Sequence, residues 1–189
     1  MPNNRAGALA MVLGIDMLVS VVTLALFFAV GAPFGAINDW TIGIGGVLTA
    51  LLVVSIDRSV RSGLGVATAL AVLGSVVVVV GAALAISETT GFLLAGLVES
   101  FGFALVGVWL ILLNLASRRG PTSPLQILGV GAGGLMAIGL IVLPAIVARV
   151  DDFDTAPAYV WRGSIGWLGI FVLYPVWAIW FGRGRASAA

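Results

Sequence analysis

The sequence predicts an all-α membrane protein, a polytopic integral membrane bundle of six transmembrane helices with both termini in the cytoplasm. Of the 189 residues, 61% are hydrophobic and only 9% are charged. A soluble domain carries roughly 25% charged residues because its surface must face water. The other two observations are six long apolar runs and a one-sided distribution of arginine. Together they indicate that lipid, rather than water, solvates the surface of the folded chain.

The apolar runs follow one another along the whole chain and predict one transmembrane domain over residues 1–189. A helix needs about 20 apolar residues to cross a hydrocarbon core of about 30 Å. Runs of about this length cover residues 8–30, 40–56, 64–86, 91–116, 125–148 and 159–181. Pro144 and Pro175 lie inside the fifth and sixth runs, where we expect them to kink the helices.

The arginines give the predicted helices a direction. If the six runs alternate, one side of the membrane receives Arg5, Arg58, Arg61, Arg118, Arg119, Arg183 and Arg185. The opposite side receives mostly acids, namely Asp39, Glu88, Asp151, Asp152 and Asp154. Cytoplasmic loops carry an excess of basic residues, so the arginine-rich side is predicted to face the cytoplasm. The expected location is the plasma membrane, which in a prokaryote is the inner membrane.

Most of the tryptophans lie near the ends of the predicted spans, where an indole ring prefers the headgroup region. We interpret these as interface anchors: Trp40, Trp161, Trp109, Trp177 and Trp180. Trp167 and Tyr174 lie deeper, and we expect their N–H and O–H groups to find partners inside the bundle.

The residue types that are missing exclude several kinds of chemistry. The chain has no cysteine and no histidine, so it cannot build a thiolate metal site, a histidine-ligated haem or an imidazole acid–base catalyst. The motifs of aspartyl intramembrane proteases and of phospholipid head-group transferases do not occur. Gly129, Gly131 and Gly134 match the dinucleotide fingerprint, but they lie within an apolar run instead of after a strand. The acidic loop 150–158 is interpreted as a solvated loop. We therefore predict no enzyme activity, no cofactor, no metal site and no nucleic-acid partner.

The 26 glycines predict close helix packing. Lipid provides little hydrophobic drive between helices, so small residues that let two backbones approach supply the packing. Gly129 and Gly133 form such a pair in the fifth run, and Gly163, Gly166 and Gly169 share a face of the sixth. We expect these faces to form contacts within the chain or between chains. Besides the lipid bilayer, the expected partners are a second copy of the chain or a larger membrane complex.

Two carboxylates lie deep within the predicted spans, Asp16 in the first and Glu99 in the fourth. Each costs about 2.5–3.5 kcal/mol to insert at the centre of a helix. At about 100° per residue, Ser20 and Thr23 share a polar stripe with Asp16. Both acids lie about eight residues from a helix end, so they would border one polar cavity if the two helices were neighbours. Asp16, Glu99, Ser20 and Thr23 are therefore the candidates for handling a proton or an ion. The alternative is that the two acids only hydrogen-bond neighbouring helices.

Two functions follow from this pattern. The first is a small proton- or cation-linked transporter or channel that uses buried carboxylates. The second is a non-catalytic accessory or scaffold subunit of a membrane complex. A transporter should contain a polar cavity that reaches Asp16 or Glu99, whereas an accessory subunit should be a dry bundle with an apolar surface for its partner.

Two stretches resemble small prokaryotic multi-pass membrane proteins that have no assigned activity. The end of the sixth run, Leu173–Arg183, carries W-x-x-W-x-G-R and is similar to their last helix. The stretch Trp109–Arg119 is similar to their middle helix. The resemblance implies the multi-pass topology and assigns no functional residue.

Overall fold

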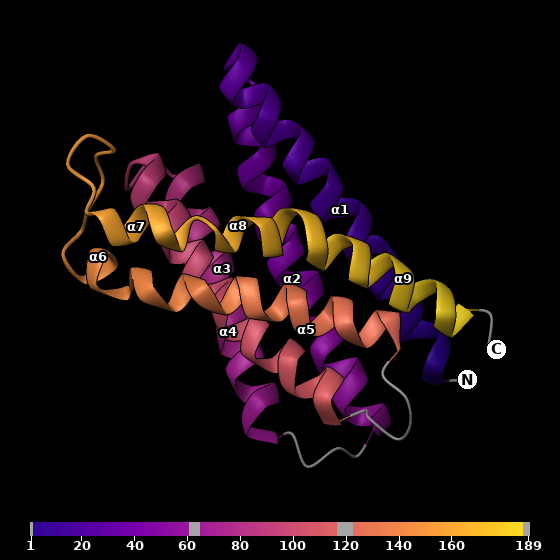
Figure 1. Ribbon diagram of the computed structural model, residues 1–189. Coiled ribbons are helices and arrows are strands. Elements are labelled where there is room, and N and C mark those ends of the chain that lie inside the picture. Colours follow the sequence, from indigo (N-terminus) through magenta and orange to yellow (C-terminus); the bar gives the residue numbers. More distant parts are fainter. Residues whose placement is uncertain (1, 61–64, 117–122, 187–189) are drawn as a thin grey trace.

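The computed structural model describes residues 2–60, 65–116 and 123–186, and within these ranges every regular element is a helix (Figure 1). The first four spans are α1 (Pro2–Val30), α2 (Phe34–Val60), α3 (Gly65–Ile86) and α4 (Phe92–Ala116). The fifth consists of α5 (Pro124–Ala137), the 3₁₀ segment η1 (Ile138–Val142) and α6 (Leu143–Val147). The sixth consists of α7 (Ala158–Gly163), α8 (Gly166–Leu168), the π-helical segment η2 (Gly169–Leu173) and α9 (Tyr174–Ala186). The predicted all-α class is confirmed, with six helices long and apolar enough to cross a membrane.

The helices pack as a closed ring. Each of the first five spans contacts the next, and the sixth contacts both the fifth and the first. Figure 1 shows the fifth and sixth spans lying antiparallel beside each other, with α1 crossing next to α9. The start of α1 and the end of α9 lie at the same end of the molecule (Figure 1). This agrees with termini on one side of the membrane; that this side is the cytoplasm stays a prediction. Three of the arginines used for that prediction, Arg61, Arg118 and Arg119, lie outside the described residues.

Glycines allow the close contacts between neighbouring helices. Gly107 of α4 and Gly133 of α5 face each other: a Cβ atom added to either would lie 2.5–2.7 Å from the carbonyl oxygen of the other. Gly74 of α3 and Gly102 of α4 form a second reciprocal contact of the same kind. At such crossings the two backbones touch directly, so any side chain would push the helices apart.

The five glycines that the sequence singled out all lie against other parts of the same chain. Gly129 faces Asn114, and Gly133 faces Gly107. Their counterparts in the sixth span pack on the fifth: Gly163 on Val142, Gly166 on Leu135 and Gly169 on Ala132. These faces therefore serve contacts inside the chain, and assembly with a second copy or another protein stays a prediction.

The fifth and sixth spans are irregular close to their prolines. The 3₁₀ segment η1 ends directly before Leu143 and Pro144, and the π-helical segment η2 ends directly before Tyr174 and Pro175. A proline lacks the N–H that would continue the α-helical ladder, so departures from α-helical geometry here have a clear cause. The sixth span is also broken at Ser164 and Ile165, between α7 and α8.

The interpretation as interface anchors is wrong for two of the five tryptophans, Trp109 and Trp177, and stays a prediction for the other three. Trp40, Trp161 and Trp180 are 47–60% exposed, as interface anchors should be. Trp109 and Trp177, however, are only 1% exposed and belong to the main core. The distance of these two residues from a helix end does not show which way their rings point. Both rings point into the bundle, and Trp177 stacks on Tyr174 with ring centroids 6.0 Å apart.

Candidate functional site

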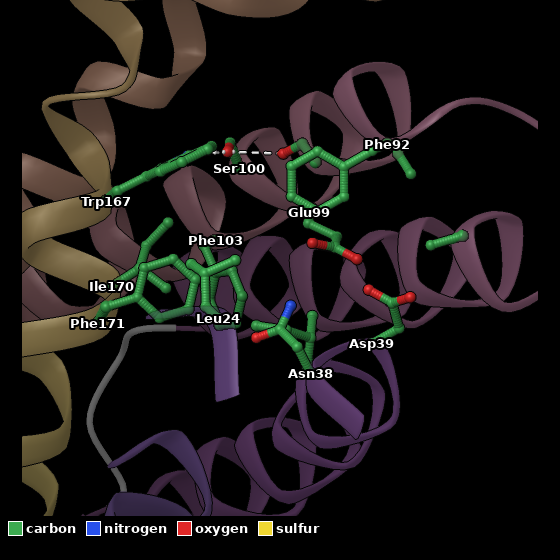
Figure 2. Close-up of a pocket in the computed structure, with 14 residues that line it drawn as sticks. Leu24, Asn38, Asp39, Phe92, Glu99, Ser100, Phe103, Trp167, Ile170 and Phe171 are labelled. Atoms are coloured by element: carbon green, nitrogen blue, oxygen red, sulfur yellow. Dashed lines mark hydrogen bonds between the residues drawn. The ribbon is translucent and has the colours of Figure 1, made fainter. Parts of the chain in front are cut away.

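A small cavity with a mainly apolar lining and four polar side chains lies inside the ring, near the end of the bundle where α1 gives way to α2 and α3 to α4; Figure 2 shows the side chains that line it. Its volume is about 30 Å³, enough for about two water molecules at the 10–15 Å³ that each needs. We call it the carboxylate cavity. Its polar lining comes from Asn38, Asp39, Glu99 and Ser100, and its aromatic lining from Phe92, Phe103, Trp167 and Phe171.

The carboxylates of Asp39 and Glu99 point toward each other across this cavity from α2 and α4 (Figure 2). Both side chains are half-buried, and none of the described residues that line the cavity is an arginine. Gly81 of α3 allows Glu99 to take this position, because a Cβ atom at Gly81 would lie 2.6 Å from the Cγ atom of Glu99. Residues of three successive helices, α2, α3 and α4, thus place the two carboxylates in one cavity.

Asn38 connects the cavity to the first helix. The hydroxyl of Ser20 donates a 2.9 Å hydrogen bond to Asn38 Oδ1, and both residues are buried. Because the amide oxygen accepts from Ser20, the amide N–H groups remain available to the cavity that Asn38 lines. Ser20, a predicted candidate, therefore acts on the cavity through Asn38.

Another part of the lining contains a hydrogen bond between the fourth and sixth spans. Trp167 Nε1 donates to Ser100 Oγ over 2.9 Å, and Ser100 Oγ donates to the carbonyl oxygen of Gly96 over 2.7 Å. Deeper in the bundle the hydroxyls of Tyr174 and Thr49 lie 3.2 Å apart. The prediction that Trp167 and Tyr174 find internal partners is confirmed.

The remaining sequence candidates lie away from the cavity. Asp16 is half-buried and faces α2, where a Cβ atom added to Gly45 would lie 3.1 Å from Asp16 Oδ2. That oxygen has no hydrogen-bond partner among the described residues. Thr23 donates to the carbonyl oxygens of Val19 and Ser20 in its own helix. Of the four candidates, Glu99 lines the cavity and Ser20 contacts it only through its hydrogen bond to Asn38, whereas Asp16 and Thr23 are not part of the lining.

Sequence reasoning missed Asp39 and Asn38, and the reason is a wrong helix start. We expected the second span to begin at Trp40, which placed Asp39 outside the membrane. The structure begins α2 at Phe34, so both polar residues lie within a helix long enough to span the membrane. Pro33, directly before the first helical residue, is the signal that would have located this start.

A second hollow, which we call the aromatic groove, adjoins the carboxylate cavity. It has a volume of about 330 Å³ and lies between α4, η1 and α7. Its walls are mainly apolar: Phe28, Leu93, Leu97, Val142, Phe153, Val160 and Trp161. Ser100 and Trp167 line both hollows, so their hydrogen bond is part of the partition between them.

The acidic loop after α6 has a structural role at the same end of the bundle. Asp151 accepts hydrogen bonds from the backbone N–H groups of Gly91, at 2.5 Å, and Leu94, at 3.0 Å. These N–H groups at the start of α4 have no partner within the helix, so Asp151 caps it from a distant segment. The loop thereby ties the fourth span to the connection between the fifth and the sixth.

Replacement of Asp151 by alanine should lower the free energy of unfolding by about 1 kcal/mol, the usual contribution of a helix cap. Denaturant titration of the purified protein in detergent measures this. Asp152→Ala is the matched control, since among the described residues the side chain of Asp152 accepts from the nearby N–H of Asp154 and from no part of α4. Equal losses in the two variants would contradict the capping role.

Comparison with known proteins identified no relative of this chain. No family model, no curated protein and no solved structure matches the chain. The case for a function therefore rests on the geometry of the site.

Proposed function

We propose that this chain is a small proton- or cation-linked membrane transporter or channel whose cation-binding site is the Asp39–Glu99 pair. The observation that carries the proposal is the meeting of these two carboxylates, from different helices, in one cavity inside the ring. Such a pair is suited to hold a cation or a proton between its two carboxylates.

Electrostatics supports this role. Two like charges at close range repel by several kcal/mol at the effective dielectric constant of about 20 that suits partly buried groups. No arginine in the lining offsets this repulsion, and Asn38 supplies only an amide. A bound positive charge removes the repulsion, so the pair creates affinity for a cation where a neutral bundle would have none.

The surroundings of the pair support transport over a purely structural role. Ionisable residues inside membrane spans are typical of ion and substrate pathways. Binding sites of transporters are commonly formed where a transmembrane helix is interrupted. Here Trp167, Ile170 and Phe171 line the cavity from α8 and η2, the interrupted part of the sixth span. The carboxylate pair and the interrupted part of the sixth span therefore line the same cavity.

Reconstitution into liposomes with an internal pH dye tests the proposal. Glu99→Gln and Asp39→Asn should each lower the proton flux driven by an imposed pH gradient at least tenfold, because each removes one of the two carboxylates that would bind the proton. Asp16→Asn is the matched control: the same chemical change in the same bundle, outside the cavity. It should retain the wild-type flux.

The opposite outcome has a clear meaning as well. Unchanged flux in Glu99→Gln and Asp39→Asn, together with a lower melting temperature, would show that the pair only holds helices together. In that case the alternative, an accessory subunit of a membrane complex, becomes the better proposal. One observation favours it: Gly131 and Gly134 on α5 are exposed with open space above them, which suits close approach of another helix.

A further inference from the structure

We propose that the ligand of the carboxylate cavity is a primary ammonium ion with an apolar chain. Its ammonium group would lie between Asp39 and Glu99, and its chain in the aromatic groove. This inference rests on the proposed function, because it takes the carboxylate pair to be a cation site and specifies the cation.

The size of the cavity selects the head group. About 30 Å³ accommodates roughly two waters, which suits an –NH₃⁺ group and the first carbon beside it. A trimethylated nitrogen is bulkier and would require the walls to move. An –NH₃⁺ group has three donors, and the cavity offers acceptors on Asp39, Glu99 and Ser100.

The walls of the cavity favour an organic cation over a metal ion. Calcium takes six to eight oxygen ligands, and magnesium keeps several waters. Much of this lining is instead aromatic, from Phe92, Phe103 and Phe171. Aromatic faces attract ammonium groups through the ring quadrupole and also contact the adjoining carbon atoms. Two carboxylates set among aromatic rings therefore match an alkylammonium ion.

The aromatic groove is placed to receive the rest of such a molecule. It is about ten times larger than the cavity, at about 330 Å³ against about 30 Å³, and is mainly apolar. Trp167 and Ser100 line both hollows and are joined by a hydrogen bond, so the chain of a bound ligand would pass beside this pair. Trp167 lies in the short helix α8, between the break at Ser164 and Ile165 and the π-helical segment that begins at Gly169. Its backbone therefore lies where a helix adjusts most easily.

Isothermal titration calorimetry in nanodiscs, with empty nanodiscs subtracted for partitioning into lipid, tests the inference with three probes. Hexylammonium should bind at least tenfold more tightly than methylammonium, which lacks the chain. It should also bind at least tenfold more tightly than hexyltrimethylammonium, whose head is too large. Glu99→Gln should weaken the binding of hexylammonium at least tenfold.

A variant of the groove separates the contribution of the chain from that of the head. Ser164 also lines the aromatic groove. Ser164→Phe should therefore fill the groove and reduce the affinity for hexylammonium to that for methylammonium, while leaving the affinity for methylammonium unchanged. Leu168→Phe is the matched control, because Leu168 is 56% exposed and lines neither hollow. If Ser164→Phe does not fold, Leu97→Phe fills the groove from the α4 wall.

The outcomes distinguish the inference from the function on which it rests. Equal affinities for hexylammonium and methylammonium, or for hexylammonium and hexyltrimethylammonium, would overturn the inference. So would the absence of binding by all three probes. In each of these cases, a loss of proton flux in Glu99→Gln would still support the proposed function, with an inorganic cation or a proton alone as the ligand. No binding together with unchanged flux would overturn both.

Discussion

Replacement of Gly133 by leucine is expected to lower the free energy of unfolding by at least about 3 kcal/mol, at the upper end of the usual cost of overpacking. A Cβ atom at this position would lie 2.5 Å from the carbonyl oxygen of Gly107 and 3.0 Å from the backbone nitrogen of Ile111. Backbone atoms of a packed helix cannot move aside as a flexible side chain does. The fourth and fifth spans would have to separate, and with them one wall of the ring.

The neighbouring residue provides the control for this change. Gly134 is exposed, and nothing lies within 4 Å of a Cβ atom added there. Gly134→Leu should keep or raise the stability, because glycine weakens a helix by about 1 kcal/mol relative to good helix formers. Unfolding in detergent, followed by circular dichroism, measures both variants. Similar stabilities would show that the contact between Gly107 and Gly133 does not hold the bundle together.

Gly96→Val is expected to abolish the proton flux while leaving the fold intact. Gly96 lines the carboxylate cavity, and a Cβ atom at this position meets nothing within 4 Å. A valine side chain would therefore enter open space, without a backbone clash, and occupy much of a cavity of only about 30 Å³. Both carboxylates remain in place, so the substitution reduces the volume of the cavity and leaves its ionisable groups unchanged. We expect at least a tenfold loss of flux and an unchanged or higher melting temperature.

The same substitution on the outer face of α5, Gly131→Val, controls for the effect of a valine in a transmembrane helix, since this glycine also has open space above it. Flux assays in liposomes and thermal unfolding decide the outcome. Wild-type flux in Gly96→Val would mean that cations do not pass through or occupy this cavity.

The sequence predicted the class and the number of spans because both depend on averages over many residues. About 20 apolar residues in a row indicate a span whatever their exact order. The fourth span was placed within one residue at its start, since Gly91 and the following Phe92 mark a sharp boundary. The burial of Glu99 followed from the cost of exposing its charge to lipid.

The composition of the site was less accessible from the sequence, because it depends on where individual side chains point. Asn38 and Asp39 are two polar residues in succession, and by composition alone they favoured a loop. Their place in a helix became evident only when Phe34 proved to be its first residue. Asp16 was found at the expected depth, but its direction toward Gly45 depends on how α1 rotates against α2. Such rotations result from packing against neighbours that lie far away in the chain.

The closed ring has a consequence for the way the protein is made. The ribosome delivers α1 first and α9 last, yet these two helices pack directly against each other, with Gly14 on Pro175 and Gly182 on Met11. Until the last helix is inserted, α1 therefore lacks one neighbour, and the cavity lacks the wall that includes Trp167. The two acids are synthesised well before the aromatic side chains of the sixth span that enclose them. The site that we propose for a cation would therefore acquire its full lining only once the sixth span has packed against the first.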